Sequence, residues 1–93
     1  MAELVSGKYL EYKGKPLVRE GDTICYGDMN DKFILVLEIM SYKTVGDMQV
    51  PDTIFIQVSN PKNQTEIYRQ GSKNGLYEAM SMGLIWLERA LLS

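Results

Sequence analysis

The side chains best suited to metal or acid-base chemistry in this 93-residue chain are carboxylates, because it contains no histidine. Asp28, Asn30 and Asp31 fall within four residues in the segment YGDMNDK, and oxygen ligands this close together suit a hard cation. An EF-hand loop also needs a glycine after its third ligand and a later glutamate, and the segment has neither. Since Gly, Asn and Asp all favour turns, we interpret it as a connecting turn and expect no metal site.

Glu38 is the other notable carboxylate, because it interrupts the apolar run FILVLEIM at residues 33–40. Burial would raise the pKa of this carboxyl group and make it a candidate functional acid. The alternative is that Glu38 marks where one sheet face emerges from under the helix, or that it pairs with a Lys or Arg across the sheet. We favour this alternative because unpaired buried glutamates are rare.

Motifs for catalysis are absent from the sequence. It has no Walker loop, no GxGxxG and no GxSxG, and its single cysteine, Cys25, cannot form a thiolate cluster. Without histidine it also lacks the commonest general base. We therefore expect no catalytic residues, no cofactor and a non-enzymatic protein.

Aromatic and cationic residues alternate at several places, as they do in proteins that bind single-stranded nucleic acid. On one open sheet face they would offer stacking platforms in a positive groove; these residues are Tyr9, Tyr12, Lys13, Tyr42, Lys43, Tyr68 and Arg69. The formal net charge of −2 supplies no broad attraction for polyanions. Nucleic-acid binding is therefore kept only as an alternative function.

The elements that must position these residues begin with strands. Residues 8–27 contain turn signals at Gly14 and at Gly21-Asp22, which predict a three-strand meander. Residues 33–40 predict a central strand covered on both faces for most of its length. Residues 53–59 alternate and predict a strand, and residues 65–70 predict either a sixth strand or a loop.

The closing segment GLYEAMSMGLIWLERALLS, residues 75–93, predicts a helix capped by Ser72 or Asn74, and we favour Asn74. A spacing of about 100° per residue places one apolar stripe toward the sheet, namely Leu76, Met80, Leu84, Leu87 and Leu91. Beside this stripe, small residues form a groove that would admit another backbone, namely Ala79, Gly83 and Ala90.

The outer arc of this helix contains two aliphatic residues in its middle, Ile85 and Leu92. Scattered exposed aliphatics at a fraying terminus are one interpretation. We favour the other, a surface that binds a second copy or a protein partner, with Trp86 as its anchor. The predicted partner-binding residues are Met82, Ile85, Trp86, Arg89 and Leu92. A third hypothesis is a small-molecule sensor whose pocket between sheet and helix is lined by Met40, Met80 and Met82.

Composition predicts one globular domain over residues 1–93, with 45% hydrophobic and 24% charged residues. A lone cysteine fits a reducing cytoplasm. The start, MAELVSGKYLEYK, lacks the apolar block of a secretory signal, and no apolar run approaches the roughly 20 residues that span a bilayer. We therefore expect a soluble cytoplasmic protein.

The segments KYLEYKGKPLVREGDTICYGDMNDKFILVL and GLYEAMSMGLIWLERAL give the chain a family resemblance. It resembles small uncharacterised bacterial proteins of the Firmicutes type, in which a β meander precedes one C-terminal helix. The resemblance implies a bacterial cytoplasmic setting and assigns no activity to any residue. The predicted fold is α+β: a mostly antiparallel sheet of five to six strands, as a meander or a barrel-like sheet, with the helix packed on one face.

Overall fold

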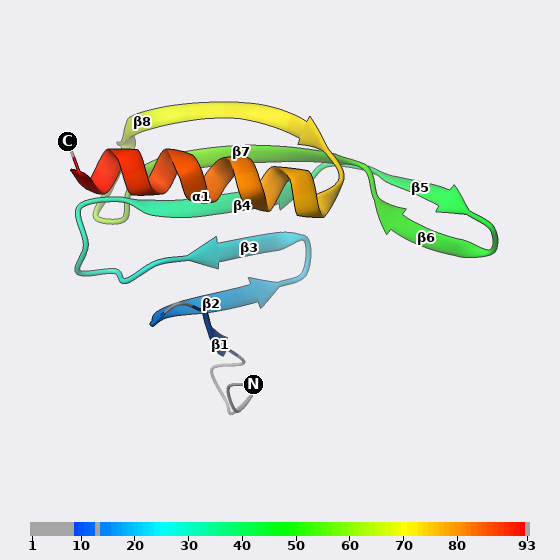
Figure 1. Cartoon of the computed structure of the whole chain (residues 1–93), viewed down its shortest axis with the longest axis horizontal. Helices are drawn as coiled ribbons and strands as arrows, with labels where there is room; N and C mark the ends of the chain where they lie inside the picture. The colour runs from blue at the N-terminus through cyan, green and yellow to red at the C-terminus, as the bar shows by residue number, and fades with distance from the viewer. Residues whose placement is uncertain (1–8, 13, 93) are drawn as a thin grey trace.

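The computed structural model describes residues 9–12 and 14–92. They form an open antiparallel sheet of six strands in the order β1-β2-β3-β4-β7-β8, a separate two-stranded arm, and one helix (Figure 1). Because β1 and β8 are the two edges, the sheet is not a closed barrel. The predicted α+β class with one C-terminal helix on an antiparallel sheet is confirmed. The strands and helix are β1 (Tyr9–Tyr12), β2 (Lys15–Glu20), β3 (Thr23–Tyr26), β4 (Ile34–Ile39), β5 (Tyr42–Val45), β6 (Met48–Pro51), β7 (Thr53–Asn60), β8 (Asn63–Asn74) and α1 (Leu76–Leu92).

The first three strands form the predicted meander. Gly14 and Gly21 both adopt positive φ angles, of 81° and 62°, which a residue with a β-carbon rarely takes, and they make the two tight turns. Leu17 of β2 then lies opposite Tyr26 of β3, so both side chains point to the face that carries α1. This half of the sheet supplies part of the site described below.

The core lies between α1 and the central strands β4 and β7. Alternate residues of these two strands face the helix and are almost fully buried; they are Leu35, Leu37, Ile39, Ile54, Ile56 and Val58. On the opposite face of β4, Ile34 is buried, Val36 is half-buried and Glu38 is exposed. The prediction that this strand is covered on both faces for most of its length is therefore wrong. Glu38 is exposed on the face away from α1, so it is not a buried acid, and it does not mark where a sheet face emerges from under the helix.

Strand β8 is longer than the sequence predicted, since it spans twelve residues and runs through the segment expected to precede the helix. Asn74 closes the strand, and its side-chain Nδ2 donates a hydrogen bond to Asp52 Oδ1 over 3.2 Å. The helix begins at Leu76, and the carbonyl of the preceding Gly75 accepts the first helical hydrogen bond from Ala79 N at 3.0 Å. The predicted caps, Asn74 and Ser72, are therefore wrong, because both residues belong to the strand.

Strands β5 and β6 were not predicted and form an arm that projects beyond the sheet (Figure 1). The turn at its tip contains Gly46, with φ at 65°, between Val45 and Asp47. At its base, Ser41 O accepts a hydrogen bond from Asp52 N at 2.8 Å. The arm thus continues the pairing of β4 with β7 after a bend.

Candidate interaction surface beside the helix

The smallest residues of α1 make its closest contacts with the sheet. Gly83 is buried against β4 and β7, and a β-carbon there would come within 2.6 Å of Leu35 Cδ1 and 3.3 Å of Ile56 Cγ2. Ala79 and Ala90 are fully buried on the same side of α1. The prediction that these small residues form a groove for a second backbone is therefore wrong, because the protein's own sheet occupies it.

The larger residues of α1 are consequently turned to one side of the helix rather than directly at the sheet. Leu76, Met80, Leu84 and Leu91 are only partly buried against the core, whereas Leu87 is buried. The predicted sheet-facing stripe is thus confirmed, since all five residues pack on the core, although only Leu87 is almost fully buried. The other four residues face the half of the sheet formed by β2 and β3, because α1 lies over β4, β7 and β8 (Figure 1).

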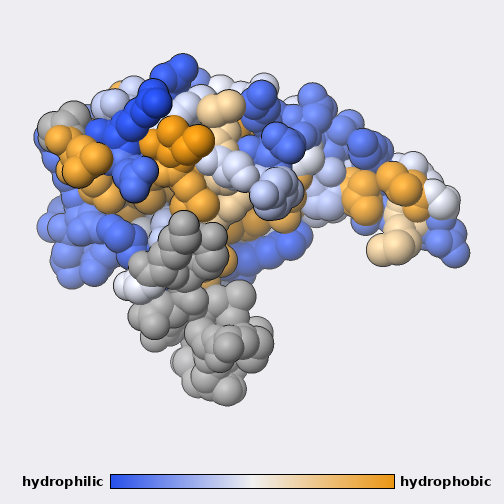
Figure 2. Space-filling model, in the orientation of Figure 1, coloured by the Kyte–Doolittle hydropathy of each residue, from blue (hydrophilic) through white to orange (hydrophobic). Residues whose placement is uncertain are grey.

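An apolar groove lies between the helix and strands β2 and β3. We call it the helix-side groove; its volume is about 580 Å³ and it is lined by Leu17, Ile24, Leu37, Leu76, Tyr77, Met80, Ser81 and Leu84. A smaller hollow of about 340 Å³ continues from Leu84 toward the end of the helix and is lined also by Lys15, Tyr26, Ile85, Leu87, Glu88 and Leu91. Together they make one side of the helix an open, largely apolar surface. Figure 2 shows apolar residues gathered on the body of the protein in this view.

The outer rim of this surface contains the two aliphatic residues that the sequence singled out. Ile85 is 48% exposed and Leu92 is 82% exposed, and Tyr77 at the start of α1 is exposed as well. At about 100° per residue, Ser81 and Glu88 lie between the groove-side leucines of the helix and these two aliphatic side chains. We call Tyr77, Ile85 and Leu92 the outer rim.

Trp86 does not lie on this surface, although it was predicted as the anchor of an interface. It is only 8% exposed. Its indole packs on β8, where a β-carbon at Gly71 would lie 3.1 Å from Trp86 Cη2. The guanidinium carbon of Arg69 lies 4.8 Å from the ring centroid, so Arg69 covers the indole. Trp86 is thus a core residue of its own chain.

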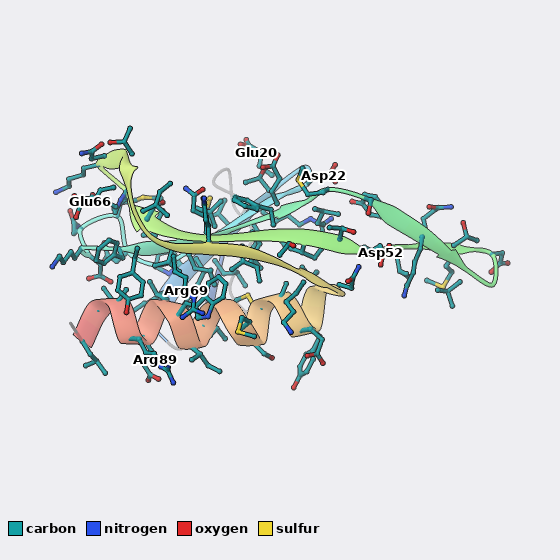
Figure 3. All side chains as sticks on the ribbon, turned by 90° about the horizontal axis from the view of Figure 1, so that it is seen from above. Glu20, Asp22, Asp52, Glu66, Arg69 and Arg89 are labelled. Carbon is teal, nitrogen blue, oxygen red and sulfur yellow. The ribbon has the colours of Figure 1, made fainter. Side chains whose placement is uncertain are left out.

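Of the other two predicted partner-binding residues, Met82 packs on the core and Arg89 lies in solvent. Met82 is half-buried and packs against the core. Arg89 is exposed, and its side chain points away from the sheet, whereas Arg69 lies between the sheet and the helix (Figure 3). The structure therefore brings only Ile85 and Leu92 of the predicted set to the open side of the helix.

The predicted methionine pocket is found between sheet and helix, but with a different lining. Only Met80 contributes to the helix-side groove. Met40 is exposed next to the arm, and Met82 packs on the opposite side of the helix from the groove. Leucine and isoleucine side chains supply most of the apolar lining instead.

The residues predicted for nucleic-acid binding do not form one surface. Tyr42 and Lys43 belong to the arm, whereas Tyr68 and Arg69 belong to β8. Tyr68 lies at a register shift of β8 and makes a tilted ring contact with Phe33, with 5.6 Å between the ring centroids. Tyr9 and Tyr12 lie on β1, where no side chain is described, and Lys13 lies outside the described residues.

The acidic segment after β3 is the connecting turn that the sequence predicted. Asn30 N donates to Asp28 Oδ1 at 2.8 Å, which closes a local turn, and Lys15 Nζ forms an ion pair with Asp31. Across residues 9–12 and 14–92, no group of three or more Asp, Glu, Cys or His side chains is arranged to hold a metal ion.

Comparisons with known proteins give no match that would assign a function to this surface. No protein-family model, no curated protein and no solved structure matches the chain. Among the described residues, no helix combines the length and the apolar character needed to cross a membrane.

Proposed function

We propose that this protein is a non-enzymatic interaction module that self-associates as a homodimer through the open side of α1. The observation that carries the proposal is that the helix-side groove, between α1 and strands β2 and β3, is not filled by other described residues and lies next to the outer rim. Monomeric proteins rarely leave a large contiguous apolar patch in water. A second copy would cover it on both subunits at once, because a two-fold interface uses the same patch twice.

The energies involved are comparable with the cost of association. Burying an exposed aliphatic side chain contributes about 1.5–3 kcal/mol, and Ile85 and Leu92 occur once in each copy. Their four side chains would contribute up to roughly 6–12 kcal/mol, less the share already buried at Ile85, before the groove is counted. The rigid-body cost of association is about 4–15 kcal/mol. The outer rim and the groove together would offset much of it.

Sedimentation equilibrium tests the proposal with the double variant Ile85→Glu/Leu92→Glu. The wild-type protein is expected to sediment near twice its chain mass of 10.6 kDa, and the variant as a folded monomer near 10.6 kDa. The matched control is Gln70→Glu/Ser72→Glu, which adds the same charge at exposed positions of β8 and is expected to remain dimeric. A monomeric wild-type protein, or a double variant that keeps the dimer mass, would contradict the proposal.

A second candidate function is the binding of an apolar small molecule in the helix-side groove. It is favoured by the groove's volume of about 580 Å³, which falls within the roughly 300–1,000 Å³ typical of ligand pockets. The fluorescent probe 1-anilinonaphthalene-8-sulfonate would then bind at one saturable site. Leu17→Gln, on the groove floor, would abolish this binding, whereas Val18→Gln, on the opposite face of the same strand, would not.

A further inference from the structure

The arm formed by β5 and β6 is a separate two-stranded sheet that projects from the body of the protein (Figure 1). All four residues of β5 are exposed, as are the first two of β6. A two-stranded hairpin by itself is marginally stable in water, and three strands or a packing partner are normally needed. The arm's persistence as a regular hairpin therefore calls for a surface that it can pack against.

The two sides of the arm differ in polarity. Val45 and Met48 lie directly opposite each other and are 55% and 64% exposed, and Val50 follows on the same side, opposite Lys43. On the other side, Gln49 Nε2 donates to Thr44 Oγ1 at 2.7 Å. On the side of Thr44 and Gln49, the polar side chains thus form a hydrogen bond with each other. The side of Val45, Met48 and Val50 is an apolar strip with Lys43 at its edge. Figure 2, which views the protein from the side of α1, shows apolar residues on the arm.

The base of the arm is fixed to the body. Tyr42 Oη donates a hydrogen bond to Asp22 Oδ1 at 2.6 Å, which ties the arm to the turn between β2 and β3. Two backbone hydrogen bonds, from Met40 N to Thr53 O at 2.7 Å and from Asp52 N to Ser41 O, join the two segments of the chain that form the base of the arm. The arm is thus presented in one direction, and such preorganisation lowers the entropy lost on docking.

The arm and the helix-side groove match in length and in chemistry. A four-residue strand extends about 13 Å, and the part of α1 from Leu76 to Leu84 that borders the groove rises about 12 Å. The groove is apolar apart from the hydroxyls of Tyr77 and Ser81, and no arm residue of the same chain lines it. The ammonium of Lys43 sits on a long aliphatic stem, so it can stay in water while the stem packs.

From this match we infer that the arm of one copy packs its apolar side, Val45, Met48 and Val50, into the helix-side groove of a second copy, and that the exchange is reciprocal. The inference rests on the proposed self-association and names the segment that occupies the groove. Each copy supplies one arm and one groove, so a two-fold dimer fills both. The arm's exposed strip and the open groove are then two halves of one interface.

Cross-linking between chains tests the inference directly. One population carries Met48→Cys and the other Ser81→Cys, both in a Cys25→Ser background, and the mixture is oxidised. An inter-chain disulfide between the two populations is expected. The control mixture pairs Met48→Cys with Ser72→Cys, which lies on the face of the sheet opposite α1, and is expected to give none. A dimer that forms no Met48–Ser81 cross-link overturns the inference and leaves the proposed function standing; a monomeric wild-type protein overturns both.

The affinity of the dimer gives a second measurement. Val45→Ser/Met48→Ser removes the apolar strip on both copies and is expected to raise the dimer dissociation constant more than ~100-fold. Thr44→Ser/Gln49→Ser, on the polar side of the same arm, is the matched control and is expected to change it less than ~5-fold. Equal effects of the two variants would contradict the inference, because they would show that only the arm's stability matters.

Discussion

Gly83 of α1 and Leu35 of β4 are in such close contact that a β-carbon on the glycine would lie 2.6 Å from Leu35 Cδ1 and 2.9 Å from Cδ2. Leu35 is fully buried, so its side chain is surrounded by other residues of the core. This contact sets the distance between helix and sheet. It also sets which side of α1 is left to border the helix-side groove.

Gly83→Ala is therefore expected to destabilise the protein, even though alanine favours a helix over glycine by about 1 kcal/mol. Overpacking a closed core costs about 1–3 kcal/mol, so the net loss in the free energy of unfolding should be about 1 kcal/mol, and Gly83→Leu should lose more. Urea denaturation measures both values.

The double variant Gly83→Ala/Leu35→Val is the control for this explanation. Leu35→Val shortens the side chain that meets the new methyl group, so it should cost less in the Gly83→Ala background than in the wild type. Additive effects of the two substitutions would show that the contact with Leu35 is not the cause.

The orientation of α1 is also the point at which sequence reasoning about the site was incomplete. Hydrophobic periodicity ranks large residues as the core side of a helix, and it placed Leu76, Met80, Leu84 and Leu91 against the sheet, where they are partly buried. The structure buries Ala79, Gly83 and Ala90 more deeply, because small residues let the helix come close to Leu35 and Ile56. The helix-side groove results from the position of α1 on the sheet, which the hydrophobic pattern of the helix alone does not predict.

The strands were predictable where alternation and turn chemistry agreed. Ile54, Ile56 and Val58 alternate with half-buried residues as expected for β7, and Gly14 and Gly21 mark the turns of the meander. The arm was missed because its short strands are polar and exposed and are bounded by turn residues. For residues 65–70, which belong to β8, the sequence could not distinguish a strand from a loop. The reason is similar, since an edge strand with an exposed side carries few apolar residues.

Arg69 and Trp86 lead to a second prediction. The guanidinium lies 4.8 Å from the indole centroid and screens it from water. Arg69→Ala is expected to lower the free energy of unfolding by about 0.5–2 kcal/mol, through loss of the cation–π contact and of packing. It should also increase quenching of the single tryptophan by acrylamide. Arg89→Ala, an exposed arginine of α1, is the matched control, and a quenching increase of equal size there would contradict the assigned contact.

Cys25 leads to a third prediction, on thiol reactivity. It is half-buried on β3, and burial, with a smaller contribution from the charge of Glu20, raises the pKa of its thiol. Since the thiolate is the reactive form, Ellman's reagent at pH 8 should react more slowly with the folded protein than with the urea-unfolded chain. Glu20→Gln should increase the folded-state rate only modestly, because burial is the main cause. Equal rates in the folded and unfolded states would contradict this assignment.

The same shift has a consequence for stability. A thiol whose pKa is raised on folding keeps its proton more readily in the native state, so the free energy of unfolding should fall as the pH rises above about 8.5, the ordinary value for a cysteine. Cys25→Ser should remove this component of the pH dependence. Denaturation curves between pH 7 and pH 10 measure it.

Tyr42 and Asp22 give the last prediction, which concerns the attachment of the arm. The hydrogen bond that Tyr42 Oη donates to the Asp22 carboxylate is the main cause that raises the pKa of Tyr42, because an ionised tyrosine could no longer donate it. The folded pKa thus lies above the unfolded value of about 10. The contribution to stability is fully present below that value and is lost as the pH rises through the folded pKa. Absorbance at 295 nm, compared between the wild type and Tyr42→Phe, isolates this one tyrosine, and Asp22→Asn should shift its titration back toward the ordinary range. A Tyr42 titration unchanged by Asp22→Asn would show that the carboxylate does not hold the arm's base.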